Sequence, residues 1–147
     1  MPWDTLFSAA NIYAAIAWVI LILLPRWEWS MRALLVGGAG LLSLAYAFLI
    51  IGFWTGGIDI GPGNGEEGNF SSVAGVQALF AKDGGLVLGW VHYLAFDLFV
   101  GLWIAREADE RGVSRFIQAP ILLATFLAGP LGLTFWLIAR ETFAKEK

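Results

Sequence analysis

The sequence predicts an all-α integral membrane protein, a bundle of four transmembrane helices in a single domain over residues 1–147. Three observations predict this fold. Hydrophobic residues make up 59% of the chain and the mean hydropathy is +0.72, well above the range of soluble domains. Charged residues make up only 14% and gather between apolar runs, whereas a soluble helical protein carries them along every helix. Four apolar runs have about the 20 residues that a helix needs to cross a bilayer.

The first two spans are expected at residues 6–24 and 33–54. The first ends before Pro25, which cannot donate the next helical hydrogen bond. The connection 25–32 is short, so the two helices should be antiparallel neighbours, and its tryptophans and arginines are residue types that anchor helices at the membrane surface. The start of the chain contains Asp4 and no Lys or Arg before the first apolar run, so we expect a retained helix rather than a cleaved signal peptide.

The longest connection, residues 55–85, has two parts of different character. The glycine-rich, acidic run 56–69 predicts an aqueous loop. It resembles a calcium-binding loop only loosely, because the regular Asp/Asn spacing and the final glutamate of an EF-hand are missing. The run 70–83 repeats apolar residues at helical spacing, which predicts a short amphipathic helix on the membrane surface or dipping into the bundle.

The third and fourth spans are expected at residues 86–105 and 116–138, joined by a short, densely charged connection. Pro130 lies inside the fourth span, where a proline removes a backbone hydrogen bond and kinks the helix. We expect this kink to open a pocket against the third helix, with the run 70–83 as a lid.

The basic residues indicate the orientation in two conflicting ways. The two short connections carry five arginines, whereas the long connection carries only Lys82, so the short connections should be cytoplasmic and both termini outside. Basic residues after the fourth span, beginning at Arg140, argue the opposite. Small residues at Ala39, Ser43 and Ala47 share one helix face and indicate either close packing within the bundle or a homodimer.

Composition also excludes several kinds of site. Cysteine is absent and His92 is the only histidine, which excludes disulfides, cysteine metal sites, sites with several histidines and bis-histidine haem within one chain. The net charge of −3 and the lack of a basic patch give no reason to expect a nucleic-acid partner. We expect no metal and no cofactor.

The candidate catalytic residues lie together on the third span. Asp97 is near its middle, where a charged carboxylate costs about 2.5–3.5 kcal/mol to insert and often marks a functional site. The alternative is a structural carboxyl group that ties two helices together. Tyr93 lies one turn earlier on the same face. His92 lies about 140° around the axis and about 7.5 Å along it, so it should approach a shared ligand from another angle rather than bond to Asp97.

His92 has its own alternative, an interfacial histidine bonded to a loop. We expect Asp97, His92 and Tyr93 to carry proton transfer. The residues expected to line a hydrophobic ligand are Trp90, Phe96, Gly101, Pro130 and Phe80.

Several blocks in chain order carry a resemblance: Leu6–Ser8, Phe70–Ser72 with Gly75-Val76 and Leu79-Phe80, Trp90–Phe99, and Gly129–Gly132. Together they resemble the small membrane-protein family of neoxanthin synthesis, named after an abscisic-acid-deficient plant mutant, which has bacterial homologues of unknown function. The resemblance covers nearly the whole chain, and the block with His92 and Asp97 is its most specific part. For the plant members it implies conversion of the epoxide violaxanthin to the allenic neoxanthin, an isomerisation without a redox cofactor.

The resemblance and the residues together predict a membrane-embedded isomerase of a carotenoid or isoprenoid epoxide that works by acid/base chemistry. The alternative is a non-catalytic carotenoid- or lipid-binding membrane protein or an accessory subunit. Aromatic residues make up 15% of the chain and suit either function, because flat apolar ligands pack well on aromatic rings. The expected partners are membrane lipid and a hydrophobic polyene or isoprenoid ligand, and the expected location is the inner (plasma) membrane of a bacterium.

Overall fold

The computed structural model describes residues 1–62 and 68–143, and the described part contains helices and no strands. Residues 63–67, the middle of the expected aqueous loop and of its calcium alternative, lie outside the described residues, and the described parts of that loop, 56–62 and 68–69, contain no helix or strand. The elements are α1 (Trp3–Leu23), α2 (Glu28–Ala33), the π-helix η1 (Leu34–Gly40), α3 (Leu41–Trp54), α4 (Val73–Phe80), α5 (Asp83–Glu110), α6 (Arg115–Leu127), α7 (Gly129–Ala139) and the 3-10 helix η2 (Arg140–Phe143).

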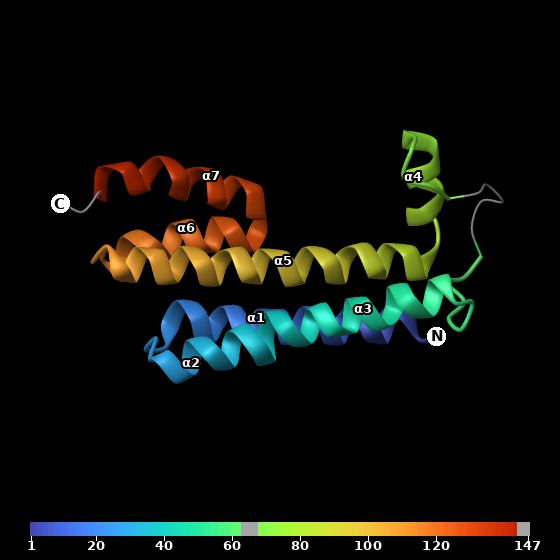
Figure 1. Cartoon of the computed structure of the whole chain (residues 1–147), viewed down its shortest axis with the longest axis horizontal. Coiled ribbons are helices and arrows are strands. Elements are labelled where there is room, and N and C mark those ends of the chain that lie inside the picture. The colour runs from blue at the N-terminus through green and yellow to red at the C-terminus, as the bar shows by residue number, and fades with distance from the viewer. Residues whose placement is uncertain (63–67, 144–147) are drawn as a thin grey trace.

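Among the described residues, three helices are long and apolar enough to cross a membrane, which supports the expected integral membrane protein. They are α1, the continuous helix Glu28–Trp54 made of α2, η1 and α3, and α5. The 28 residues of α5 span about 42 Å, more than the roughly 30 Å of a hydrocarbon core. The first two spans are antiparallel neighbours beside α5, as expected (Figure 1).

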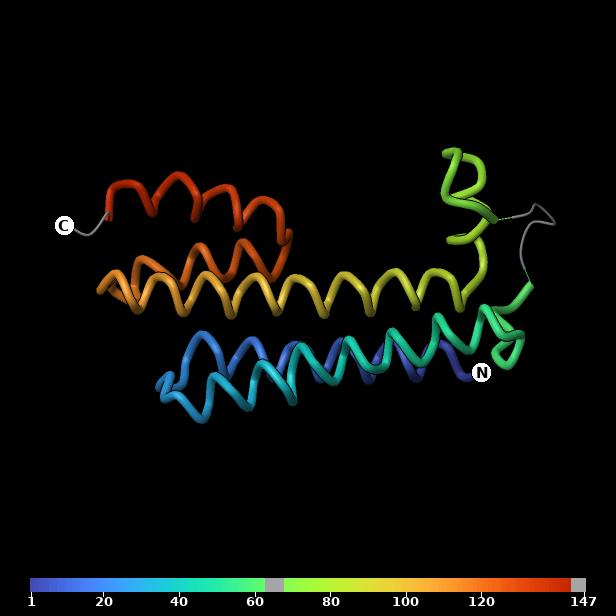
Figure 2. The backbone as a smooth tube through the Cα atoms, in the orientation of Figure 1, coloured from blue at the N-terminus to red at the C-terminus, as the bar shows by residue number. Residues whose placement is uncertain are grey.

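The expected fourth span, residues 116–138, is wrong as one continuous helix. It is interrupted at Ala128, whose extended backbone (φ −159°, ψ 85°) separates α6 from α7. At 13 and 11 residues, the two helices are about 20 Å and 17 Å long, too short to cross a bilayer. The chain reverses direction between them and returns along α6 (Figure 2). We call α6 and α7 the hairpin, and Phe126–Gly129 the hairpin turn.

Glycine and proline explain why the hairpin closes. Pro130 lies in the first turn of α7, where its missing N–H group and fixed φ angle suit the start of a helix. Gly132 lies directly against Thr125, because a Cβ atom built at Gly132 would be 2.3 Å from the Thr125 backbone nitrogen. The expected kink at Pro130 is therefore a complete reversal.

The amphipathic helix expected within 70–83 is confirmed as α4, which lies across the end of α5 far from the hairpin (Figure 1). Ala39 is buried within the chain and Ser43 is exposed, so the bundle itself accounts for Ala39 and the homodimer stays a prediction. Core packing centres on α5, where Leu98 is fully buried against the η1 glycine Gly38.

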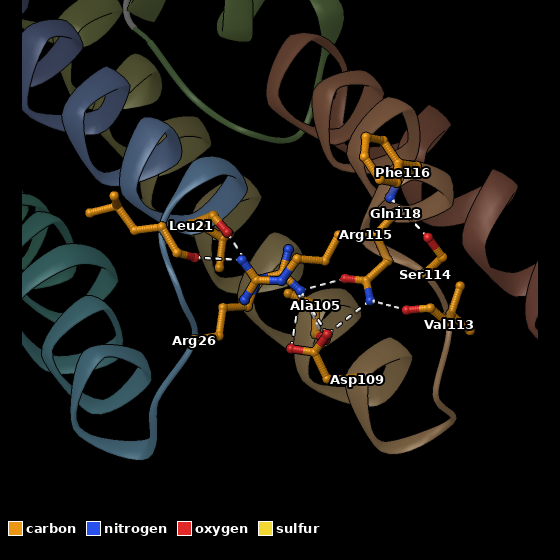
Figure 3. Close-up of polar contacts among 10 residues, drawn as sticks. Leu21, Arg26, Ala105, Asp109, Val113, Ser114, Arg115, Phe116 and Gln118 are labelled. Carbon is orange, nitrogen blue, oxygen red and sulfur yellow. Dashed lines mark hydrogen bonds and ion pairs between the residues drawn. The ribbon is translucent and has the colours of Figure 1, made fainter.

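One end of the bundle is held by ionic contacts (Figure 3). Arg26 has a side chain only 3% exposed; it donates to the Leu21 carbonyl at 2.9 Å and pairs with Asp109 at 3.1 Å. Its guanidinium also bonds to the Gln118 side-chain oxygen, and the Gln118 amide donates to Asp109 at 2.8 Å. Burial lowers the pKa of Arg26 below its ordinary value, and the Asp109 carboxylate opposes that shift. This contact set joins α1, α5 and α6.

A second contact set at the same end joins α7 to α5. Glu107 pairs with Arg111 at 2.8 Å and with Arg140 at 3.1 Å, and it accepts the indole N–H of buried Trp136 at 2.7 Å. The end of α7 therefore lies on the same side as the two arginine-rich connections, opposite the N-terminus (Figure 1). Arg140 therefore lies on the same side as the arginines of the two short connections and no longer conflicts with them, and the side of the membrane that each terminus faces stays a prediction.

Candidate functional site

Asp97 lies midway along α5, at the point where the hairpin reverses. Its side chain is buried (7% exposed) and its carboxyl group presses against Gly129, where a Cβ atom would be 1.9 Å from Oδ1. Only glycine at this position lets the carboxyl group meet the first residue of α7. The backbone amide of Gly129 faces the carboxyl group, as does the Tyr93 hydroxyl. A helix N-terminus favours negative charge, so the break in the helix creates a polar place for Asp97 inside the apolar bundle.

The carboxyl group of Asp97 contains one buried oxygen without a hydrogen bond to any described residue. Oδ2 is buried and has no hydrogen-bond partner among the described residues. Buried polar atoms in native proteins are nearly always paired, and exceptions call for an explanation such as a catalytic role or a missing ligand.

Tyr93 reaches the other half of the hairpin turn. Its hydroxyl donates to the Leu127 carbonyl at 3.0 Å, and the Phe126 carbonyl is 3.4 Å away. The last carbonyls of a helix have no partner within the helix, so Tyr93 satisfies groups that the end of α6 leaves free. The structure thus brings two side chains of α5 to the hairpin turn. Tyr93 contacts the end of α6, and Asp97 contacts the start of α7.

A row of aromatic rings leads to this point from the N-terminal half of α1. Phe7 and Trp90 have ring centroids 5.5 Å apart, and Trp90 and Tyr93 are 5.2 Å apart. The Trp90 indole N–H donates to the Asn11 side-chain oxygen at 3.0 Å, which fixes the ring against α1. Trp90 remains partly exposed, so one surface of this row is open to a ligand or to lipid.

His92 and Phe96 lie in a different place. The His92 ring stacks on Phe96, with ring centroids 4.7 Å apart, and it packs against Tyr46 of α3, with ring centroids 5.2 Å apart. These contacts are on the side of α5 that meets α3, whereas Asp97 meets α7. The expectation that His92 does not bond to Asp97 agrees with this placement, and the catalytic role of His92 stays a prediction.

The remaining ligand-binding candidates are dispersed. Gly101 packs against the ring of Trp18, which is 2% exposed, so its small size serves helix packing. Pro130 is exposed at the start of α7, and Phe80 packs on Gly89 of α5. A groove of about 850 Å³ lies between η1–α3 and α5 instead of beside Pro130, and Phe96 is the one predicted ligand residue that lines it. Their roles as ligand contacts stay predictions.

A family model described as ABA DEFICIENT 4-like matches residues 5–136. The match runs from α1 through α7 and includes Asp97, Tyr93 and the hairpin turn. The chain belongs to the ABA DEFICIENT 4-like family. This family is associated with neoxanthin and abscisic acid synthesis, so the resemblance found in the sequence is confirmed. No curated protein and no solved structure is significantly similar to the chain.

Two features of this ABA DEFICIENT 4-like chain were not predicted from the sequence. Gly129 belongs to the family block 129–132, but its contact with Asp97 follows from the reversal of the hairpin. The Gly129-Pro130 pair was the signal in the sequence that indicated a new helix at this point, because proline favours the first turn of a helix. Asn11, which holds Trp90, is an isolated polar residue in an apolar helix. Among the described residues, no three acidic or histidine side chains are placed to hold a metal ion.

Proposed function

We propose that this chain is a membrane-embedded isomerase of a carotenoid or isoprenoid epoxide, with Asp97 and Tyr93 as its acid/base pair. The observation that carries the proposal is the buried Asp97 Oδ2, which has no partner in the described part of the chain although it lies deep in a membrane helix. Such a group is expensive in the bilayer and often functional. The association of the family with neoxanthin synthesis supports an epoxide carotenoid as the class of substrate.

The reaction moves protons without net electron transfer. A base takes a proton from a vinylic carbon next to the epoxide, and the electron pair forms the second double bond of an allene. The carbon–oxygen bond of the epoxide breaks, and the oxygen receives a proton to become an alcohol. Asp97 is the proposed base and Tyr93 the proposed acid. Because the two groups face each other, a proton passes back from Asp97 to Tyr93 and restores both.

The aromatic row supports a flat, apolar substrate. The ring centroids of Phe7, Trp90 and Tyr93 follow one another 5.5 Å and 5.2 Å apart, and the last of these rings carries the Tyr93 hydroxyl. Ring surfaces of this kind pack well against a conjugated chain. A polyene that lay along the row would bring its ring end to the hairpin turn, where the unpartnered oxygen of Asp97 is located.

The test is turnover in reconstituted membranes that contain an epoxide carotenoid, with the allenic isomer measured by chromatography and absorbance. Asp97→Asn keeps the shape of the side chain but removes its acid/base function, so turnover should fall about 100- to 10,000-fold. Tyr93→Phe should also lose turnover. His92→Gln should lose less, because its contacts lie towards α3. Retained polyene binding by the inactive variants would separate binding from chemistry.

The second candidate is a non-catalytic carotenoid- or lipid-binding protein, and one observation favours it. Asp97 faces the start of α7, and Tyr93 bonds to the end of α6. A helix that is broken inside the hydrocarbon region needs such polar partners for the backbone groups that the break leaves free. In that case both residues only hold the hairpin turn. Wild-type protein that binds the polyene but forms no isomer, or Asp97→Asn with normal turnover, would rule out the catalytic proposal.

A further inference from the structure

The apolar groove described above lies on the side of α5 that faces η1 and α3, away from the hairpin turn. The apolar groove of about 850 Å³ is lined by residues such as Val36, Leu41, Leu44 and Phe96. The only hydroxyl group in its lining, that of Ser43, donates to the Ala39 carbonyl at 2.8 Å. The volume is within the roughly 300–1,000 Å³ of typical ligand pockets.

This groove continues into a charged mouth. A second cavity of about 460 Å³ shares Leu35 and Phe99 with the apolar groove. Its charged lining consists of three arginines and three carboxylates, Arg26, Arg32, Arg106, Glu28, Asp109 and Glu110. The mouth lies at the ionic end of the bundle, where α1 meets α2 and where α5 ends, so it is at the level of lipid headgroups.

The charges at the mouth divide into two kinds. Arg26 is buried, and its guanidinium group is already paired with Asp109 and Gln118. Arg32 and Arg106 are 78% and 76% exposed, and within the described part of the chain each pairs only with a carboxylate on its own helix, at 3.0 Å and 3.4 Å. Such exposed pairs contribute little to stability, so both guanidinium groups can exchange these partners for a phosphate. Arginine binds phosphate oxygens in a two-pronged geometry.

We propose that this groove holds one phospholipid whose headgroup carries a phosphate and a primary ammonium, the phosphatidylethanolamine class. An acyl chain occupies the apolar part, the phosphate lies between Arg32 and Arg106, and the ammonium lies beside Glu28 and Glu110. The equal numbers of opposite charges at the mouth match a zwitterionic headgroup better than a purely anionic one. The inference does not depend on the proposed isomerase function.

Glycine keeps the apolar part open. Gly37 and Gly40 line it from the π-helix η1, and a Cβ atom built at Gly37 meets no heavy atom within 4 Å. A larger side chain at Gly37 therefore extends into the groove rather than into the core. This provides a variant that blocks the groove while leaving the packing of α5 intact.

The experiment is native mass spectrometry of delipidated protein in detergent. The protein is incubated with equal amounts of phosphatidylethanolamine, phosphatidylcholine and phosphatidylglycerol that carry the same acyl chains. One phosphatidylethanolamine should be retained in preference to the other two. Arg32→Gln with Arg106→Gln should weaken its retention about tenfold. Gly37→Leu should abolish preferential retention, and Lys82→Gln, outside the mouth, should not change it.

Equal retention of all three lipids would overturn the proposal, because it indicates ordinary surface lipid only. Preference for phosphatidylglycerol would overturn the zwitterionic assignment. Unchanged retention in both the arginine and the Gly37 variants would also overturn it. Circular dichroism of each variant confirms that it is folded, and the readout is lipid mass, so the outcome is independent of any effect on turnover.

Discussion

The ionic end of the bundle and the hairpin turn are two places where polar side chains enter the interior, and they differ in how well those groups are paired. At the ionic end, Arg26 contacts Leu21, Asp109 and Gln118, and Glu107 accepts from three donors. At the hairpin turn, Oδ2 of Asp97 has no partner among the described residues. A parallel at the ionic end is Arg140 Nε, which has no hydrogen-bond partner among the described residues and lies 3.7 Å from a carboxylate oxygen of Glu141.

This difference separates a structural polar cluster from a candidate reactive one. Charges that only hold helices together are expected to be fully paired, because an unpaired buried group costs free energy. Arg26 and Glu107 meet that condition, and they also serve as the connection between α5 and its neighbours. Asp97 does not meet it, which is the observation that supports the proposed catalytic role.

The largest expected effect concerns the side of the membrane on which the chain ends. Single cysteines at positions 28, 110 and 143 should all react with a membrane-impermeant reagent from one side, and a cysteine at position 57 from the other. The reason is that Glu107–Arg140 pairing returns α7 to the ionic end. The absence of natural cysteine makes the labelling unambiguous. Reaction at position 143 from the same side as position 57 would restore a four-span topology.

A stability loss is expected at the ionic end. Arg26→Leu removes a side chain that is 3% exposed and leaves Asp109 and Gln118 without their partner. Because Asp109 is still about one-third exposed, we expect about 3 kcal/mol of destabilisation, the low end for breaking a buried ion pair. Thermal unfolding in detergent measures it. The matched control is Arg32→Leu, whose exposed pair with Glu28 should matter little. Equal losses in both variants would contradict the structural role of Arg26.

A smaller effect is expected at the hairpin turn. Gly129→Ala places a Cβ atom where the Asp97 carboxyl group lies, so that group or the start of α7 must move. Overpacking of this kind costs about 1–3 kcal/mol. Gly37→Ala is the matched control, because its Cβ atom meets no neighbour within 4 Å and its stability should stay close to wild type. Unfolding temperatures of the two variants measure the difference, and identical values would show that Asp97 does not pack on Gly129.

Much of the fold was predictable because it depends on local pattern. Residues 6–24, 33–54 and 86–105 were recognised from apolar length alone, and the structure has long helices over each. The helix α4 followed from apolar spacing within 70–83. The candidate site was recognised in part: Asp97 and Tyr93 share one helix face, and the structure brings both to the hairpin turn. Their partners Gly129 and Leu127 were not predicted, because they meet α5 only after the chain has reversed.

The sequence by itself determined that this protein is helical, that it has helices long and apolar enough to cross a membrane, and that it belongs to the ABA DEFICIENT 4-like family. These conclusions rest on hydropathy and on short blocks of residues, which are properties of neighbouring positions. Only the tertiary structure decided that residues 116–138 form a hairpin. An apolar stretch of that length suits a single span equally well. The reversal is stabilised by contacts between distant residues, Gly132 with Thr125 and Arg140 with Glu107, and these exist only when the helices pack.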